Sequence, residues 1–278
     1  MRFLLLLFPY LFPHETPTLR YTQPLEVTEF ASGLSGIDCI YVVNLEERPE
    51  RWNRMKTLCE ERRLKVNRVN AINGWKFPRD IEIKLMGPYL NRANYLGGGR
   101  IGCLLSHLSI FKDALDRGFQ VIWILEDDAD FLEDIQQLPQ LLVKLSKIDP
   151  LWDAFYTDQD YRNADGTYIK ACAIDPRPNQ PLYPLSHYTQ KNKVSENIVQ
   201  IYERYGTHSI FWSQRGLQKA LEYFKHVYLW TSFDIDIHYI PDIREYAPTK
   251  DIVSNLTHSS SDTIQESPLN PESSSLSK

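Results

Sequence analysis

The chain lacks the features that mark nucleic-acid-binding and zinc-binding proteins. Its net charge is −5 and it has no long run of Lys and Arg, so the basic surface of a nucleic-acid partner is missing. Its 4 cysteines form no C-x-x-C pair, which argues against a zinc cluster. Because Cys39, Cys59 and Cys103 fall in apolar patterns, we predict buried free thiols, which favour a reducing compartment.

Of the 12 glycines, three stand together as Gly97-Gly98-Gly99. The triplet by itself lacks the spacing of either phosphate-loop fingerprint. We therefore interpret it as a flexible hinge.

The apolar residues 3–12 are too few to cross a bilayer as a helix, and Pro9 and Pro13 interrupt them. A signal-peptide core, a peripheral membrane-surface segment and an unfolded leader all remain open, since no small-x-small cleavage site follows. We predict a leader and linker over 1–36, one large domain over 37–258 and a disordered tail, rich in Ser, Pro and Glu, over 259–278. The expected location is the cytoplasm or the cytoplasmic face of a membrane, with a secretory route open.

What is present is an ordinary globular composition, with 12% aromatic and 24% charged residues. Apolar patterns alternate between strands and helices, which predicts an α/β fold. The expected strands are 40–45, 65–72, 121–125, 152–157 and 206–212. The expected helices are 49–63, 101–115, 138–145 and 213–224. Residues 158–196 are rich in Pro and Asn and are predicted to be a long substrate loop or disorder.

Three carboxylates come directly after the most apolar strand, at the point where it leaves the core. They are Glu126, Asp127 and Asp128. In open α/β sheets, ligands bind beyond the carboxyl ends of the strands. Adjacent acids repel one another unless a cation or several N–H donors neutralise them, and such oxygen ligands suit Mg²⁺ or Mn²⁺. The alternative is a solvated acidic turn in which Asp127 or Asp128 caps the next element of the chain.

Two further groups of polar residues are candidates for the same site. Arg48 and Arg51 follow the first strand, where a phosphate or ribose could lie, although a solvated helix start is the alternative. Ser106 and His107 lie beside the apolar stripe of their helix. A histidine in that position is either a structural group or part of the site.

Five blocks of sequence occur in the order found in a known family, over roughly residues 37–256. They are Val43-Asn44-Leu45 with Arg48 and Arg51, Asn70-Ala71-Ile72-Asn73-Gly74, Ile101-Gly102-Cys103 with Ser106-His107, Ile124-Leu125-Glu126-Asp127-Asp128, and Gly206-Thr207-His208-Ser209 followed by Ser213 and Gly216. Together they resemble glycosyltransferase family 25, which includes bacterial lipooligosaccharide galactosyltransferases and collagen galactosyltransferases.

The resemblance implies a GT-A-like nucleotide-diphospho-sugar transferase fold with a central, mostly parallel sheet flanked by helices. It implies a UDP-sugar donor and a glycan acceptor such as lipopolysaccharide, lipooligosaccharide or a glycoprotein. The transferred hexose would be galactose or glucose, moved with inversion at the anomeric carbon. The expected cofactor is Mn²⁺ or Mg²⁺.

Carried over residue by residue, the resemblance assigns two sets of side chains. The metal ligands would be Asp128 and Asp127. The nucleotide-sugar-binding residues would be Asn44, Arg51, Ser106, His107, Glu126 and Asp127.

Inversion also needs a carboxylate that takes the acceptor proton. Asp234 and Asp236 are the candidates because they come after the acceptor-side loops, and the choice between them stays open. The alternative makes Asp234 a helix cap and Asp236 its solvated neighbour. His208 or His258 could add a metal ligand, or serve a structural role.

One departure from the family pattern bears on activity: Arg100 stands where the family usually has Glu. It keeps open a catalytically inactive member that binds glycans or proteins. A metal-dependent phosphohydrolase is a further alternative. It would need a second metal about 4 Å from the first, and the lack of further Asp/His clusters near Asp127 argues against it. Asn255-Leu256-Thr257 is a formal glycosylation acceptor.

Overall fold

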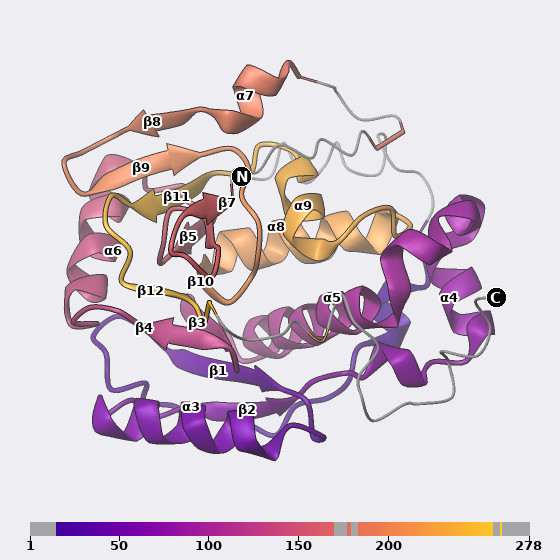
Figure 1. Ribbon diagram of the computed structural model, residues 1–278, viewed down its shortest axis with the longest axis horizontal. Coiled ribbons are helices and arrows are strands. Elements are labelled where there is room, and N and C mark those ends of the chain that lie inside the picture. Colours follow the sequence, from indigo (N-terminus) through magenta and orange to yellow (C-terminus); the bar gives the residue numbers. More distant parts are fainter. Residues whose placement is uncertain (1–14, 170–176, 179–182, 258–261, 263–278) are drawn as a thin grey trace.

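The computed structural model describes residues 15–169, 177–178, 183–257 and 262. Its centre is an eight-stranded sheet with helices on both faces (Figure 1). In order across the sheet, the strands are β2 (Asn67–Asn70), β1 (Cys39–Asn44), β3 (Val121–Glu126), β10 (Ser209–Ser213), β5 (Ala154–Tyr156), β11 (Glu245–Pro248), β9 (Ile198–Ile201) and β8 (Lys191–Lys193). The predicted leader up to residue 14, His258 and all of the predicted tail except Asp262 lie outside the described residues.

The predicted α/β fold is confirmed, and its sheet is more mixed than expected. Strand β1 pairs in parallel with β2 and β3, and β5 pairs in parallel with β11. Strand β10 runs antiparallel to both β3 and β5, and β9 is antiparallel to β11 and β8. Because Ser209 pairs with Leu125, the start of β10 lies beside the carboxyl end of β3. The inserted antiparallel strand therefore brings a second chain segment to the three acids.

The apolar run of β3 packs on both faces of the sheet. Ile122 and Ile124 belong to the core cluster on the side of α5 (Ala93–Asp116) and α8 (Gln214–His226). Trp123 and Leu125 belong to the opposite cluster, with residues of α3 (Pro49–Glu61) and α6 (Gln137–Ile148). Side chains alternate across a strand, so a strand covered on both faces is apolar throughout. The predicted burial of this strand is confirmed.

The start of α8 follows its predicted local chemistry. The Oγ of Ser213 accepts a hydrogen bond from the main-chain N of Gly216 at 3.1 Å, as an N-cap does. Helix α5 begins earlier than predicted, at Ala93, and contains Gly97 at a φ of 59°.

The glycine triplet packs closely against another segment, in contrast to the flexible hinge that its spacing suggested. A Cβ on Gly74 would lie 1.9 Å from the carbonyl oxygen of Gly98. A Cβ on Gly102 would lie 2.2 Å from the carbonyl oxygen of Ile72. We call Gly74, Gly98 and Gly102 the glycine seam. Main chain touches main chain along it, and that contact requires residues without side chains.

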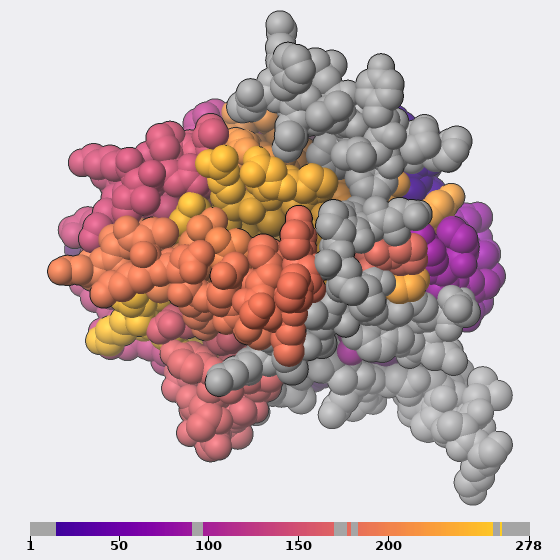
Figure 2. All heavy atoms as spheres, turned by 90° about the horizontal axis from the view of Figure 1, so that it is seen from above, coloured from indigo at the N-terminus to yellow at the C-terminus, as the bar shows by residue number. Residues whose placement is uncertain are grey.

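Several short elements have no clear sequence pattern. They include α4 (Arg79–Met86), α7 (Leu185–Thr189), α9 (Phe233–Asp236), β4 (Ala129–Phe131), β6 (Tyr161–Arg162), β7 (Tyr168–Ile169) and β12 (Val253–Asn255). The 3-10 helices are η1 (Thr18–Tyr21), η2 (Gly74–Lys76), η3 (Gly87–Arg92) and η4 (Ile237–Tyr239). In Figure 2 the orange segment that carries β8 and β9 runs across one face of the molecule.

Residues 15–36, predicted as part of the linker, pack on the domain. The main-chain N of Thr16 donates to the carbonyl of Lys225 at 2.8 Å. The Oδ1 of Asn67 accepts from the main-chain N of Thr28 and of Glu29, each at 2.9 Å. This segment therefore contributes to the same folded body as β2 and α8.

Two observations bear on membranes and glycosylation. Within the described residues, no helix combines the length and the apolar character needed to cross a bilayer. The formal acceptor Asn255 is buried, and its amide bonds to the main chain of Arg162 through both Oδ1 (2.8 Å) and Nδ2 (2.9 Å). The folded domain therefore does not present this amide to a modifying enzyme.

Candidate active site

A cleft opens at the carboxyl ends of β1 and β3. It encloses about 590 Å³ when its open mouth is included. The described residues that line it are Val43, Asn44, Leu45, Arg51, Ala71, Ile72, Asn73, Gly74, Trp75, Gly99, Cys103, Ser106, Glu126, Asp127, Asp128 and Asp262. This edge of the sheet is where α/β folds place ligands.

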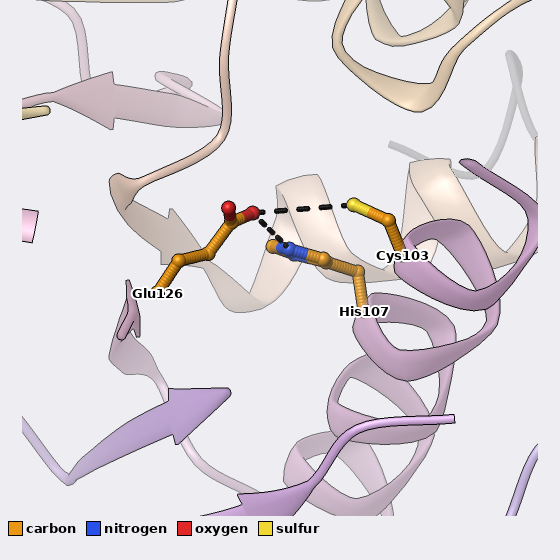
Figure 3. Close-up of side chains that lie close together, drawn as sticks. All are labelled: Cys103, His107 and Glu126. Carbon is orange, nitrogen blue, oxygen red and sulfur yellow. Dashed lines mark hydrogen bonds and ion pairs between the residues drawn. The ribbon is translucent and has the colours of Figure 1, made fainter. Parts of the chain in front are cut away.

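Glu126 is held by donors from α5 and from the start of β10. Figure 3 shows Cys103 and His107, one turn apart on α5, pointing toward the Glu126 carboxylate. Oε1 of Glu126 lies 3.1 Å from His107 Nε2 and 3.9 Å from Cys103 Sγ, and it also accepts from the Thr207 hydroxyl. Burial opposes ionisation, but the contacts with His107 and Thr207 outweigh it and lower the pKa of Glu126. Glu126 is therefore an ionised, positioned carboxylate.

Cys103, His107 and Glu126 could also hold a metal, because their ligand atoms lie within 4.8 Å of one another. In the structure, however, the donors of this group already point at a single oxygen, Oε1 of Glu126. We therefore interpret the group as a hydrogen-bonded support for the carboxylate.

Asp127 is engaged by side chains from β1 and α3. Nδ2 of Asn44 donates to its Oδ2 at 2.6 Å, and Nη1 of Arg51 lies 3.4 Å from its Oδ1. Asn44 is oriented in turn by Arg68, whose Nε donates to Asn44 Oδ1 at 2.9 Å. Burial raises the pKa of Asp127, against the opposing influence of Asn44 and Arg51. Of the predicted nucleotide-binding residues, Asn44, Arg51, Glu126 and Asp127 thus meet in one place.

Asp128 differs from its two neighbours. Its Oδ1 is buried and has no hydrogen-bond partner within the part of the chain that the structure describes. Burial, followed by the charges of Glu126 and Asp127, raises the pKa of Asp128 to about 7. A buried carboxylate oxygen with unmet hydrogen-bonding capacity is costly unless something compensates it. Its oxygen donor and adjacent acids fit a hard divalent cation.

Ser106 and His107 lie at the back of the cleft. The Oγ of Ser106 donates to the Gly102 carbonyl at 2.7 Å and accepts from the main-chain N of Ile72 at 2.8 Å, so it ties the cleft wall to α5. His107 is fully buried, with its ring 4.8 Å from that of Phe233. Ser106 lines the cleft, whereas His107 reaches it through Glu126.

The two candidate bases lie on the short helix α9 and have different surroundings. Asp236 is 1% exposed, forms an ion pair with Arg177 (Nε to Oδ1, 3.0 Å) and accepts from the Tyr223 hydroxyl at 3.1 Å. Asp234 is half-buried, and its Oδ2 accepts from the main-chain N of Gly206 at 2.8 Å, just before Thr207. Residues two apart on a helix do not face each other. Asp234 therefore points to the start of β10 and Asp236 to a separate buried ion pair.

The charges of Asp234, Glu126 and Asp128 act on the same two groups, Tyr161 and Cys103. Burial raises the pKa of Tyr161 to about 12, and the next causes are the charges of Asp128, Glu126 and Asp234. Burial also raises the pKa of the Cys103 thiol well above its ordinary value, with contributions from the charges of Glu126, Asp234 and Asp128. Both groups therefore sense Asp234 together with the acids of β3.

The additional candidate His208 has a structural setting. Its Nε2 lies 2.8 Å from Oδ2 of Asp158, a carboxylate that also pairs with Arg204 and accepts from the Ser254 hydroxyl at 2.7 Å. Burial opposes ionisation of Asp158, but Arg204 and His208 outweigh it and lower its pKa to about 2. Arg100, the departure from the family pattern, is half-buried in α5 beside Gly99, which lines the cleft.

Sequence reasoning missed three residues of the cleft region: Trp75, Thr207 and Asp262. The indole Nε1 of Trp75 donates to the main-chain carbonyl of Asp262 at 3.0 Å. Thr207 belongs to one of the five sequence blocks, which assigned it no role. No pattern in the polar tail distinguishes Asp262 from its neighbours.

A mixed α/β sheet that carries an acidic cleft beyond its central strand has the GT-A-like architecture of glycosyltransferases. The model of the family described as "Glycosyltransferase family 25 (LPS biosynthesis protein)" matches residues 37–238 of this chain. The chain belongs to glycosyltransferase family 25, as the five sequence blocks predicted.

Several curated relatives share part of this region. A glycosyltransferase 25 family member of Drosophila pseudoobscura pseudoobscura is 37% identical over 124 residues, which is 41% of this chain and 19% of the relative. Procollagen galactosyltransferase 2 of Mus musculus is 30% identical over 149 residues, 48% of this chain and 23% of the relative. Inactive glycosyltransferase 25 family member 3 of Homo sapiens is 28% identical over 163 residues, 55% of this chain and 26% of the relative. The matched region thus spans about a quarter or less of each of these relatives.

Proposed function

We propose that the chain transfers a hexose from a UDP-sugar to a hydroxyl group of a glycan acceptor, with inversion and with the help of a divalent cation. The observation that carries this proposal is the buried Oδ1 of Asp128, which has no hydrogen-bond partner among the described residues and belongs to a residue that lines the same cleft as Arg51. Two relatives named procollagen galactosyltransferase 2 favour galactose as the sugar. Lipopolysaccharide, lipooligosaccharide and glycoproteins remain the acceptor classes of the proposal.

Asp128, with Asp127 beside it, would hold Mn²⁺ or Mg²⁺. A bound cation of this kind neutralises charge that develops on a departing diphosphate. Asn44 and Arg51 hold Asp127 in place, and the donors on Glu126 fix the third acid. The protein thereby holds the carboxylates of Glu126 and Asp127 in place before any ligand arrives, which is the preorganisation that catalysis needs.

Asp234 is our candidate for the base that takes the acceptor proton. Its carboxylate is half-buried and accepts a hydrogen bond from the main-chain N of Gly206, in the segment that leads into β10. Asp236 is less suited to the role because Arg177 and Tyr223 already engage both of its oxygens. A carboxylate in a buried ion pair is held in its charged form and is a poor proton acceptor.

An inactive member that only binds sugars or partners is the second candidate. Two observations favour it: the presence of Arg100 where the family usually has Glu, and a 28% identical relative whose name includes "inactive". In that case the cleft would retain ligand binding without turnover.

The test is incubation of the protein with Mn²⁺ and a panel of UDP-sugars, followed by measurement of UDP release. Release that vanishes in the Asp128→Asn variant supports the transferase. Saturable glycan binding without UDP release supports the inactive binding module. Phosphate release from simple phosphomonoesters would instead favour a phosphohydrolase.

A further inference from the structure

Asp262, from the tail, lies in the cleft against two arginines. Both of its carboxylate oxygens accept hydrogen bonds from the Arg48 guanidinium, with Nε 3.0 Å from Oδ2. Nη1 of Arg51 lies 3.4 Å from the same Oδ2. The main-chain carbonyl of Asp262 accepts from the Trp75 indole. Side chains from different parts of the chain are thus organised around one residue.

This contact is largely removed from solvent. The side chains of Asp262, Arg48 and Arg51 are 13%, 17% and 16% exposed. A two-point contact between guanidinium and carboxylate at this burial is stronger than an exposed ion pair. Asp262 therefore occupies a defined place in the cleft.

Acidic residues stand on one side of the cleft and arginines on the other, and Arg51 contacts a carboxylate on each of its own sides. Its Nη1 lies 3.4 Å from Asp127 Oδ1 on one side and 3.4 Å from Asp262 Oδ2 on the other. A ligand that fits must bring a cation to the acids and anionic oxygens to the arginines. A nucleoside diphosphate with a divalent cation has both parts.

A carboxylate and a phosphate offer the same pair of acceptors to a guanidinium. The Asp262 carboxylate is thus a chemical substitute for one phosphate group of such a ligand. It engages Nε and Nη2 of Arg48, the two donors that a phosphate would need for a two-point contact.

We propose that Arg48, Arg51 and Trp75 form a phosphate subsite for a nucleoside diphosphate, and that Asp262 is its internal competitor. This inference rests on the proposed function, because it assumes that a nucleotide sugar binds in the cleft. The nucleotide enters by displacing the Asp262 carboxylate from Arg48. The observed affinity is then the intrinsic affinity reduced by the fraction of molecules in which Asp262 has left the subsite.

The Asp262→Asn variant tests this competition. It keeps the size of the side chain and removes the charge that holds it to Arg48. We expect UDP, in the presence of Mn²⁺, to bind about 5- to 10-fold more tightly than to the wild type, as loss of a partly buried ion pair implies. Inorganic pyrophosphate should gain by a similar factor. Calorimetry on the full chain measures both.

The matched control is Asp116→Asn. Asp116 is the last residue of α5, its side chain is 65% exposed, and it pairs with Lys112 on the surface. Like Asp262→Asn, this variant removes one negative charge. Because Asp116 lies on the surface at the C-terminal end of α5, after Cys103 and His107 in the helix, UDP affinity should stay unchanged. In the Asp262→Asn background, Arg48→Gln should abolish the gain.

The outcomes separate the inference from the proposed function. If the wild type binds UDP and Asp262→Asn binds it equally or less tightly, Asp262 is no competitor and the inference is overturned. If pyrophosphate binding tightens in Asp262→Asn but UDP binds to neither protein, the anion subsite stands and the nucleotide ligand is refuted. If neither protein binds either ligand, the inference and the proposed function both fail.

Discussion

Two groups of buried acids in this protein show how differently the same side chain can be used. In the first, Asp158 and Asp236 each pair with a buried arginine and accept a further hydrogen bond from a hydroxyl group. In the second, Asp128 stands beside Glu126 and Asp127 with a buried oxygen that has no partner among the described residues. The first group is electrostatically complete, whereas the second leaves one buried carboxylate oxygen without a partner in the part of the chain that the structure describes.

The pKa values express the same difference. Pairing lowers the pKa of Asp158 to about 2 even though burial opposes it. Burial and two neighbouring acids raise the pKa of Asp128 to about 7. A carboxyl group whose charge the protein does not stabilise by itself is a marker of a functional site. Substitutions in the two groups test whether this contrast separates function from stability.

The largest effect should come from Asp128→Asn. Because this variant removes the proposed metal-binding charge, we expect UDP release to fall by on the order of 100-fold or more. Its free energy of unfolding should stay the same or rise, since a buried repulsion between acids is relieved. Steady-state kinetics and urea titration measure the two quantities. Near-normal turnover in this variant would place the metal elsewhere.

Asp236→Asn should mainly lower stability, whereas Asp234→Asn should mainly lower activity. Asp236→Asn leaves Arg177 buried without its counter-charge, so we expect the free energy of unfolding to drop by about 3 kcal/mol. Asp234→Asn should change stability by less than about 1 kcal/mol and reduce turnover by on the order of 100-fold. Urea denaturation and UDP-release assays on both variants provide the comparison. The reverse pattern would make Asp236 the base.

Stability and metal affinity should depend on pH through Asp128. Because its pKa is raised from 3.8 to about 7 in the folded protein, the native state holds an extra proton between these values. Without metal, the contribution of Asp128 to stability is therefore present at low pH and lost as the pH rises through about 7. Mn²⁺ competes with that proton, so its affinity should weaken as the pH falls below about 7.

Calorimetric titrations of Mn²⁺ between about pH 5.5 and 7.5 measure this effect. In Asp128→Asn the corresponding change in metal-free stability should disappear. A metal affinity that does not change across this interval would contradict the role assigned to the Asp128 carboxylate.

The smallest effect should come from Cys103→Ser. Cys103 contacts Glu126 at 3.9 Å, and a hydroxyl group can replace the thiol as a donor to that carboxylate. We expect UDP affinity to change by no more than about 3-fold. Since burial and the charge of Glu126 raise the pKa of this thiol, it should also resist alkylation at neutral pH. Mass spectrometry after iodoacetamide treatment checks the second point, and rapid labelling would contradict it.

The sequence predicted the parts of the site that local pattern determines. The apolar run of β3 with acids at its end, the N-cap of α8 and the arginines after β1 all appear where expected. Each depends on a few neighbouring residues, so a single chain can reveal it. The same holds for the alternation of strands and helices that indicated the fold class.

The sequence did not separate Asp234 from Asp236, because their partners come from distant segments. Arg177 is 59 residues away from Asp236 in the chain, and Gly206 is 28 residues from Asp234. Likewise Asp262 meets Arg48 across 214 residues. Contacts of this range depend on how the whole sheet is assembled, and no short pattern encodes them.

The glycine seam has a consequence for engineering. Gly74 lines the cleft, and Gly74, Gly98 and Gly102 meet through main-chain atoms that no larger residue could approach. This wall therefore presents peptide groups, whose chemistry a point substitution leaves unaltered. A mutant library aimed at a different sugar should therefore spare the seam, and it should also spare Arg51 and Trp75, which belong to the proposed phosphate subsite.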